Sequence, residues 1–259
     1  MFQSKGQRLL YPRYIPAIRS GTGKVLLPFS FQVIFFRTLT NHSSYVTPIP
    51  DSLPSADAAP MLCAGVTTYT ALRKSGAKSG QWVVISGAGG GLGHLAVQIA
   101  SKGMALRVIG IDAGPKEKVV LDSGAEHFID IMAHDDASME TEVKKLTGGL
   151  GASAVIVCTA SNKAYAQGMN LLRFSGTLVC VGMPEGELQG IATTYPSVMV
   201  AKDTRVVASA VGTRKDAIET LDLAARGVVK VHHRVEKMEK LTEVSCGFLR
   251  GSGLVSGDY

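Results

Sequence analysis

The chain has 259 residues, of which 46% are hydrophobic and 19% charged, as is typical of an ordered globular protein with one large or two smaller domains. Its net charge of +6 equals the six Lys and Arg residues of positions 1–50, where no Asp or Glu occurs. The remainder is balanced in charge, which argues against a nucleic-acid-binding face, and no apolar run approaches the length of a membrane span.

Residues 1–42 differ in composition from the rest of the chain. They are rich in Arg, Lys, Ser and Pro, and their apolar patch at 25–36 is short and interrupted. This composition is that of a mitochondrial transit peptide, with a disordered tail or translated non-coding sequence as the alternatives. We therefore expect a poorly packed segment, and a cytoplasmic protein unless the segment directs it to mitochondria.

The four cysteines are widely spaced and form no C-x-x-C pair: Cys63, Cys158, Cys180 and Cys246. Their spacing predicts reduced thiols in a reducing compartment and no disulfide framework. Since Cys158 and Cys180 lie inside apolar runs, we expect both to be buried in the core.

A first helix is predicted from Ser55, as its N-cap, to a stop at Gly76. The next element is a strand at 82–85, which is apolar without polar alternation and should be buried on both faces. This strand leads into the glycine-rich stretch 87–93, and then into a helix. The apolar positions of that helix are Leu92, Leu95, Ala96 and Ile99.

The order strand, glycine turn, helix is the setting of a dinucleotide-binding loop. Glycines let the backbone turn tightly and approach a pyrophosphate, while free N–H groups at the helix start face the anion. The spacing Gly87-x-Gly89-Gly90-x-x-Gly93 is one residue longer than G-x-G-x-x-G, because position 92 is Leu. Alone, the loop is equally compatible with an ordinary glycine-rich turn.

A second observation favours the cofactor site. The strand predicted over 106–111 ends at Asp112, about twenty residues beyond the loop, where dinucleotide folds place an acid that binds the adenosine ribose. A carboxylate there would repel a 2′-phosphate, so NAD is favoured over NADP. An ordinary Asp at a strand end is the alternative.

Strands and helices alternate through the rest of the chain. Further strands are predicted at 127–130, 154–158, 177–181 and 205–210, and further helices at 115–123, 138–146, 162–172 and 215–226. The last helix carries an apolar stripe of Ile218, Leu221 and Ala225. Six strands in this rhythm predict an α/β fold, a doubly wound parallel six-stranded sheet of the Rossmann type. The adjacent His232 and His233 should point to opposite faces of an extended, solvent-facing segment, and so form no metal-chelating pair.

Together these motifs resemble the zinc-containing alcohol dehydrogenases, medium-chain dehydrogenases of the fungal tetrameric type. The matching pieces are PMLCAGVTTYTAL, WVVISGAGGGLGHLAVQIA, RVIGIDAGPKEK, GAEHFID, TLVCVGMPEG and HRVEKMEKLTEV, within about residues 43–250. The resemblance implies NAD-dependent hydride transfer with a small-molecule alcohol or aldehyde, performed by a GroES-like catalytic domain and a Rossmann domain.

The resemblance also assigns cofactor contacts. The pyrophosphate would lie on the loop formed by Gly87, Gly89, Gly90, Gly91, Leu92 and Gly93, and the adenosine ribose on Asp112 and Lys116. The residues implied beside the nicotinamide are Thr67, Val181, Gly182, Met183, Ser209 and Val211.

The zinc site departs from the family. Cys63 falls where the family has the third ligand of its catalytic zinc, but no cysteine precedes it and the only upstream histidine is His42. The four-cysteine structural zinc lobe is absent as well. Catalytic zinc needs three protein ligands and an open position. We therefore expect Cys63 to pack within its helix, and no catalytic residue set to be intact.

The expected organisation is a basic segment (1–42), a junction between catalytic and cofactor domains (43–76), a Rossmann domain (77–228) and a catalytic-domain remnant (229–259). In this remnant Asp258 replaces a phosphate-binding Arg of the family. Three functions are compatible with this organisation. One is an alcohol dehydrogenase-like oxidoreductase lacking most of its catalytic domain. The second is a non-catalytic NAD-binding module that forms homo-oligomers through the edge strand, as family members do. The third is a zinc-free quinone reductase, whose usual NADPH preference Asp112 opposes.

Overall fold

The computed structural model describes residues 46–240. All of these lie in the second of the two units into which the chain divides, Ser43–Tyr259. Among them, no helix has both the length and the apolar character needed to cross a membrane. The predictions for residues 1–42, for Cys246 and for Asp258 fall outside the described residues.

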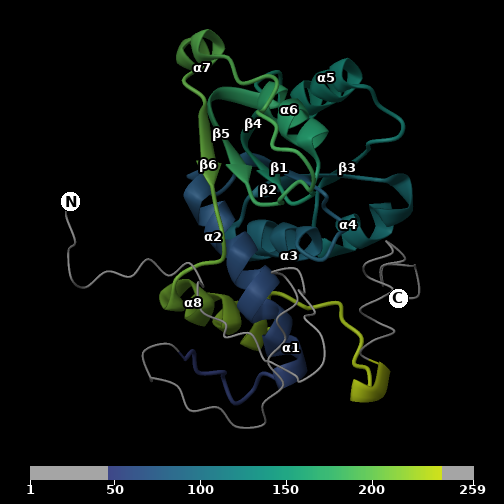
Figure 1. Ribbon diagram of the computed structural model, residues 1–259, viewed down its shortest axis with the longest axis vertical. Helices are drawn as coiled ribbons and strands as arrows, with labels where there is room; N and C mark the ends of the chain where they lie inside the picture. The colour runs from purple at the N-terminus through teal and green to yellow at the C-terminus, as the bar shows by residue number, and fades with distance from the viewer. Residues whose placement is uncertain (1–45, 241–259) are drawn as a thin grey trace, which may run out of the picture. The chain divides into compact units, whose positions relative to one another are not determined.

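A six-stranded parallel sheet forms the centre of the described region (Figure 1). Its order is β3-β2-β1-β4-β5-β6, which confirms the predicted α/β class. The strands are β1 (Trp82–Ser86), β2 (Arg107–Asp112), β3 (His127–Asp130), β4 (Ala152–Val157), β5 (Leu172–Cys180) and β6 (Arg205–Ala208). The order reverses between β1 and β4, so the carboxyl ends of these strands border the crevice in which such sheets bind ligands.

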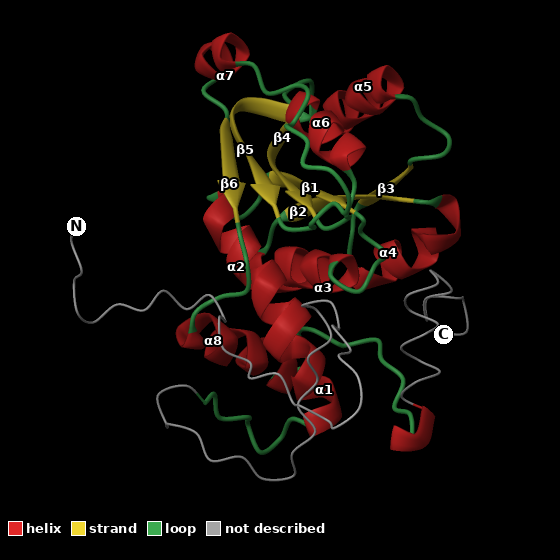
Figure 2. Ribbon diagram, in the orientation of Figure 1, coloured by secondary structure: helices red, strands yellow, loops and turns green. Residues whose placement is uncertain are grey.

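Helices cover both faces of the sheet, as Figure 2 shows with the strands in yellow. On one face lie α2 (Val66–Ser75), α3 (Gly93–Gln98) and α4 (Glu117–Ser123), and on the other α5 (Asp136–Leu146) and α6 (Asn162–Asn170). Helix α8 (Arg214–Ala225) packs on α2 and on α1 (Ser55–Pro60), while α7 (Pro196–Lys202) lies beside β5. Four short turns complete the elements: π-helical turns at Met61–Gly65 and Ile99–Gly103, and 3-10 turns at Gly114–Lys116 and Met238–Lys240.

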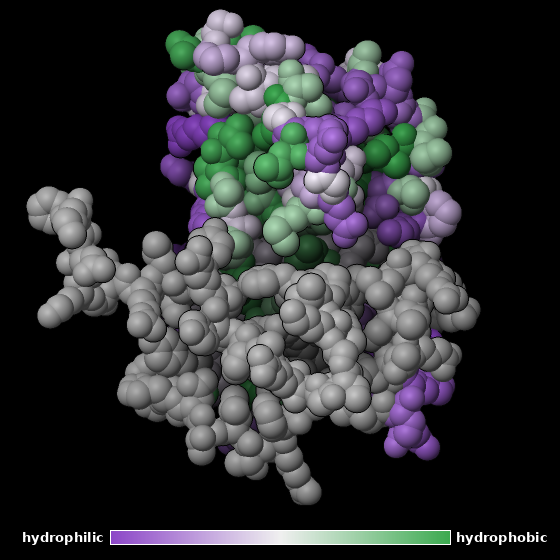
Figure 3. All heavy atoms as spheres, in the orientation of Figure 1, coloured by the Kyte–Doolittle hydropathy of each residue, from purple (hydrophilic) through white to green (hydrophobic). Residues whose placement is uncertain are grey.

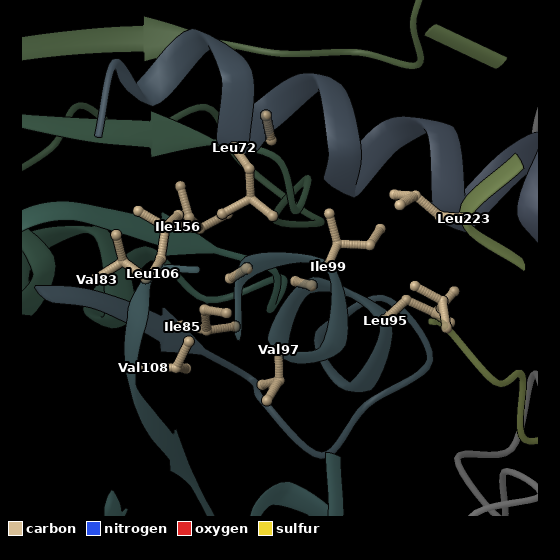
Figure 4. Packing of buried hydrophobic residues seen from close by; sticks show 14 of the residues in the cluster. Leu72, Val83, Ile85, Leu95, Val97, Ile99, Leu106, Val108, Ile156 and Leu223 are labelled. Carbon is tan, nitrogen blue, oxygen red and sulfur yellow. The ribbon is translucent and has the colours of Figure 1, made fainter. Parts of the chain in front are cut away.

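Alternate residues of each central strand enter two different hydrophobic cores. Ile85 packs with Leu72, Leu95 and Ile99 on the α2–α3 side (Figure 4), whereas the neighbouring Val84 packs toward α5 and α6. Burial of one such aliphatic side chain stabilises the fold by about 1.5–3 kcal/mol. Two buried faces require a continuous apolar run, which is the pattern that predicted β1.

Two helix termini differ from the prediction. The single helix predicted from Ser55 to Gly76 is divided into α1, the π-helical turn Met61–Gly65 and α2, and its N-cap position is Pro54, with extended backbone (φ −57°, ψ 141°), and not Ser55. Its predicted stop at Gly76 is confirmed, since this residue is left-handed with φ +69°. Helix α5 begins at Asp136, because the Asp135 side chain accepts a hydrogen bond from the Ser138 N–H and caps the helix.

The boundary between α6 and β5 was predicted wrongly. The helix ends at Asn170 and the strand begins at Leu172, five positions before the predicted start at 177. Leu172 pairs with Ala152, and the register then shifts before Thr177 pairs with Ala154. An irregular stretch with Ser175 at φ +57° fills the interval, and its polar residues favoured a loop in the sequence.

Helix α8 presents a different face to the core from the predicted one. Ile218 is 43% exposed, while the buried positions include Ala217, Thr220, Leu221 and Ala224. The core therefore accepts the small polar Thr220 in place of Ile218. Its hydroxyl donates to the carbonyl of Asp216 within the helix, which satisfies the buried group.

Candidate cofactor site

The glycine loop joins β1 to α3 through a turn that needs glycine at several positions. Gly87 has φ +78°, a conformation that L side chains rarely adopt. A Cβ on Gly93 would lie 1.9 Å from the Gly87 carbonyl oxygen, so the start of α3 packs directly on the turn. A Cβ on Gly91 would instead meet nothing within 4 Å. The loop is thus closed toward the protein and open at Gly91.

Asp112 closes the second side of this loop. Its Oδ2 accepts a hydrogen bond from the Gly89 N–H at 2.8 Å, and its Oδ1 accepts one from the Ala113 N–H at 2.8 Å. The Lys116 ammonium lies 3.6 Å from Oδ1. A Cβ on Gly89 would lie 2.7 Å from the Lys116 Cβ, so glycine is also required here. The structure therefore brings together the loop and both residues predicted for the ribose.

The segments that follow β4, β5 and β6 continue the same edge of the sheet. The N–H of Cys158 donates to Ser86, that of Gly182 to Val157, and that of Ser209 to Cys180, each at 2.9 Å. The predicted nicotinamide-side residues Val181 and Gly182 are half-buried at this edge, and Met183 is 83% exposed. The carboxyl ends of four adjacent strands thus lie side by side.

Thr159 and Tyr165 belong to this edge but were not predicted. A Cβ on Gly182 would lie 2.2 Å from the Thr159 carbonyl oxygen, and one on Gly87 would lie 3.2 Å from the Thr159 backbone N. The hydroxyl of Tyr165 donates to the Gly182 carbonyl. Burial raises the pKa of Tyr165 to about 12, which keeps this donor protonated. Thr159 directly follows a predicted strand and could have been found from its edge position, whereas no sequence signal indicates Tyr165.

Two unusual features mark the end of β6. Ser209 is buried, and within residues 46–240 its Oγ has no hydrogen-bond partner. Val211 has φ +47°, which is costly for a β-branched residue, and its side chain is 50% exposed. An unsatisfied buried hydroxyl and local backbone strain are both characteristic of functional sites.

Thr67 and Cys63 lie on the helix that flanks the carboxyl edge. The Thr67 hydroxyl is used within this helix, because it donates to the Cys63 carbonyl at 2.7 Å. α2 packs against β4, β5 and β6, and the assignment of Thr67 to the nicotinamide side stays a prediction. Cys63 is exposed, so the expectation that it packs within its helix is wrong: the side chain lies on the face of the π-helical turn that faces away from the core.

The described residues do not supply a zinc site. Among residues 46–240, no group of three or more His, Cys, Asp or Glu side chains is placed to hold a metal ion. Cys158 and Cys180 are free thiols that pack against the two hydrophobic cores, but they are partly buried and not buried as predicted, since both lie at the carboxyl edge of the sheet. Burial raises the pKa of Cys158 to about 12. Catalytic zinc requires three protein ligands, and Cys63 alone does not fit that requirement.

Comparisons with known proteins agree with this geometry. The model of the family described as zinc-binding dehydrogenase matches residues 91–226. Alcohol dehydrogenase 2 of Emericella nidulans is 62% identical over 207 residues, which is 78% of this chain and 56% of that protein. The alcohol dehydrogenase of Schizosaccharomyces pombe is 42% identical over 78% of this chain and 56% of its own length.

Solved structures share the fold. The crystal structure of the alcohol dehydrogenase of Aeropyrum pernix matches this fold with a TM-score of 0.66 and a sequence identity of 29%. The matched region covers 76% of this chain and 56% of the chain in that structure. The chain thus spans about 56% of the length of the curated relatives it matches. Motifs, sheet order and family match agree, and the chain belongs to the zinc-binding dehydrogenase family, among the alcohol dehydrogenases.

Proposed function

We propose that this chain binds NAD at the carboxyl edge of its sheet and is part of an alcohol dehydrogenase-like oxidoreductase. The observation that carries the proposal is the hydrogen bond from the Gly89 N–H to Asp112, which joins the glycine loop to the acid. This bond supports the proposal, because it holds the acid and the glycine loop beside each other.

The cradle fits two parts of the cofactor, the anionic pyrophosphate and the polar adenosine ribose. The open side of Gly91 and the start of α3 would accept the pyrophosphate, since helix N-termini present free N–H groups to anions. Asp112 would accept hydrogen bonds from the ribose hydroxyls through the lone pairs that Gly89 and Ala113 leave unused. The same negative charge would repel a 2′-phosphate, which supports NAD over NADP.

The other half of the cofactor would lie toward β5 and β6. The Ser209 hydroxyl, which has no hydrogen-bond partner among the described residues, would gain one there. Val181, Gly182, Met183 and Val211 would line the same side. When bound, NAD supplies the hydride acceptor or donor of the reaction. The chain's own residues bind and orient it.

A small-molecule alcohol or aldehyde is the substrate class that we propose. Support comes from the relatives whose names are alcohol dehydrogenases, including the one at 62% identity. We also propose that the protein is cytoplasmic, as its free cysteines favour. For its assembly we propose a homo-oligomer through the sheet edge at β6, since the described strands pair with β6 on one side only.

The test is a fluorescence titration of the full chain with NADH, with NADPH as the matched control. We expect saturable NADH binding with a dissociation constant below about 1 mM, and NADPH binding at least about tenfold weaker. No saturation with NADH up to that concentration would overturn the proposal. NADH formation from NAD and a primary alcohol, with zinc content measured in parallel, then separates an active oxidoreductase from a non-catalytic NAD-binding module.

A further inference from the structure

Gly182, in the segment that follows β5, is held at each of its backbone groups. Its N–H donates to the Val157 carbonyl at 2.9 Å, which ties it to the end of β4. A Cβ on this residue would lie 2.2 Å from the Thr159 carbonyl oxygen, so its Cα packs directly on the segment after β4. Its own carbonyl accepts a hydrogen bond from the hydroxyl of Tyr165. Of these three contacts, the one from Tyr165 is the only one that a side chain makes.

Tyr165 reaches this carbonyl from the hydrophobic core. The residue is 5% exposed and lies in the first turn of α6, which packs against both β4 and β5. The side chain of Ser161 caps this helix by accepting the Ala164 N–H, which fixes the start of the helix close to the carboxyl end of β4. The ring belongs to the same buried cluster as the aliphatic side chains of Val157 and Leu178. The core thus contains a polar hydroxyl whose acceptor lies at the carboxyl edge of the sheet.

The hydrogen bond from Tyr165 also sets the direction of the next N–H in the chain, that of Met183. The peptide bond between Gly182 and Met183 is trans, as are all others among residues 46–240. In a planar trans peptide the carbonyl and the N–H point in opposite directions. Because the Gly182 carbonyl points toward α6, the Met183 N–H points away from that helix. Within the described residues this N–H has no hydrogen-bond partner, and Met183 is 83% exposed.

This N–H lies on the side of the crevice that faces the second half of a dinucleotide. The crevice is located where the strand order reverses, between β1 and β4. The proposed adenosine ribose site is Asp112, at the end of β2, so the other nucleoside would lie beyond the glycine loop, toward β4 and β5. Direct packing links the two sides, since a Cβ on Gly87 would lie 3.2 Å from the backbone N of Thr159, which in turn contacts Gly182. Hydroxyl and carboxamide oxygens of that nucleoside can accept an N–H.

We infer that Tyr165 is a positioning residue, which orients the Gly182–Met183 peptide so that the Met183 N–H donates to an oxygen of the nicotinamide nucleoside. The inference rests on the proposed NAD site and assigns one donor in its second half. Tyr165 acts through the peptide and does not touch the cofactor. Without its hydroxyl, the Gly182 carbonyl would be free to turn toward water, and the N–H would lose its fixed direction. The adenosine half would keep its contacts with Asp112 and the glycine loop.

The first readout compares three ligands that share the adenosine half. ADP ends at the pyrophosphate, ADP-ribose adds the second ribose, and NADH also carries the nicotinamide. Tyr165→Phe removes the hydroxyl and keeps the ring in the core. Calorimetry on the full chain should show NADH binding about fivefold weaker in this variant, and ADP binding changed by less than about twofold. A loss that ADP-ribose shares assigns the acceptor to the second ribose, and a loss confined to NADH assigns it to the carboxamide.

Tyr69→Phe is the matched control. It also removes a tyrosine hydroxyl that donates a hydrogen bond, in this case to Glu219 Oε2 of α8 at 2.6 Å and not to the segment after β5. Its affinities for all three ligands should equal those of wild type. Equal losses of NADH and ADP affinity in Tyr165→Phe would indicate a merely structural role and overturn the inference, as would an unchanged affinity for NADH.

The second readout needs no cofactor. Loss of a hydrogen bond at a carbonyl changes the chemical shifts of that carbonyl carbon and of the amide nitrogen that follows it. In NMR spectra, Tyr165→Phe should therefore move the Gly182 carbonyl carbon and the Met183 amide nitrogen, and Tyr69→Phe should leave both in place. Unchanged shifts in Tyr165→Phe would overturn the inference. If wild type binds neither NADH nor ADP, the proposed function fails and the donor assignment fails with it, whereas wild-type binding that Tyr165→Phe retains in full overturns the inference alone.

Discussion

The carboxylate of Asp112 accepts a hydrogen bond from the Gly89 N–H at 2.8 Å, which links the carboxyl end of β2 to the glycine loop after β1. The two strands are neighbours in the sheet, with Ser86 in register with Ile111. Asp112, the residue proposed to bind the ribose, therefore also holds in place the glycine loop that is proposed to bind the pyrophosphate. A change at Asp112 should alter binding through both roles.

Asp112→Asn should weaken NADH binding by about tenfold or more, because hydrogen bonds to a charged group are worth about 1.5–3 kcal/mol. The remaining carbonyl can still accept from Gly89, so the loop should persist. Loss of the negative charge should also narrow the difference in binding affinity between NADH and NADPH. Fluorescence titrations with both cofactors measure this. Asp122→Asn, on the exposed face of α4, is the control and should bind like wild type.

Alanine substitutions at two glycines of the loop should separate an effect on the unfolding free energy from an effect on NADH affinity. Gly93→Ala places a methyl group 1.9 Å from the Gly87 oxygen, and we expect a loss of about 1–3 kcal/mol in unfolding free energy. Gly91→Ala meets no atom within 4 Å and should change stability by less than about 0.5 kcal/mol. Its methyl group would still fill the space proposed for the pyrophosphate, so NADH affinity should fall. Unchanged affinity of Gly91→Ala would place the pyrophosphate elsewhere.

Asp216, on α8, should contribute a pH-dependent part of the stability. Burial alone would raise its pKa, but hydrogen bonds from Thr213 and the charge and hydrogen bond of Arg73 lower it below 3.8. A lowered folded-state pKa means that the stabilisation is present above the unfolded pKa and is lost as pH falls through the folded one. Asp216→Asn should cost about 1–3 kcal/mol near neutral pH, and this difference should shrink below about pH 4.

Denaturant unfolding at several pH values checks this expectation. The control is Asp222→Asn on the same helix, whose carboxylate is 57% exposed and pairs with Arg226 at 3.2 Å. An exposed pair of this kind contributes about 0–1 kcal/mol, so its variant should remain close to wild type. A constant difference between wild type and Asp216→Asn down to about pH 3 would contradict the assignment.

The parts of the fold that the sequence predicted are those with a local cause. The strand at Trp82 follows from an apolar run that two helix layers bury, and the Gly76 stop from a left-handed backbone that glycine adopts at no cost. Asp112 was found because its position is set by chain distance from the loop. These signals lie within a few residues of the feature that they predict.

The features that were missed depend on contacts between distant residues. The early start of β5 comes from the pairing of Leu172 with Ala152, and the polar residues after Leu172 gave no strand pattern. Helix α7 buries none of its residues, so it has no apolar stripe to detect. Tyr165 joins the site only because its helix brings the hydroxyl to Gly182, and the pattern of one helix carries no information on that contact.

Ala208 should control assembly through the edge of the sheet. The N–H of Ser209 donates to Cys180 of β5, so the preceding N–H, that of Ala208, points away from β5. Ala208→Pro removes this outward donor and should convert a β6-linked oligomer to single chains, as light scattering would show. Ala208→Ser keeps the donor and should assemble like wild type. Oligomers that survive Ala208→Pro would have to use another surface.

Other surfaces for such an oligomer are available. Hydrophobic residues are exposed on the face of the described region seen in Figure 3. Large side chains with high exposed fractions include Met183 at 83%, Leu188 at 103% and Val200 at 82%. The last of these lies on α7 beside β5. A Val200→Lys variant therefore tests α7 separately, because a charge there would disrupt an apolar contact without touching the β6 edge.

The thiol of Cys63 should react rapidly in the native protein, because its side chain is exposed. Burial raises the pKa of Cys158 to about 12, so very little of its reactive thiolate exists at neutral pH. Maleimide labelling followed by peptide mass spectrometry should modify Cys63 at least about 100-fold faster than Cys158. Denatured protein, in which both thiols react, provides the control for peptide detection.

The same labelling decides the role of Cys63 toward zinc. A zinc-bound thiolate is shielded, whereas residues 46–240 place no group of three potential ligands together. We therefore expect equal labelling rates with and without added Zn²⁺. Protection by micromolar Zn²⁺ that a Cys63→Ser variant abolishes would contradict this expectation, because ligands outside residues 46–240 would then have to complete the site with Cys63. In that case the alcohol-dependent formation of NADH should rise with zinc content.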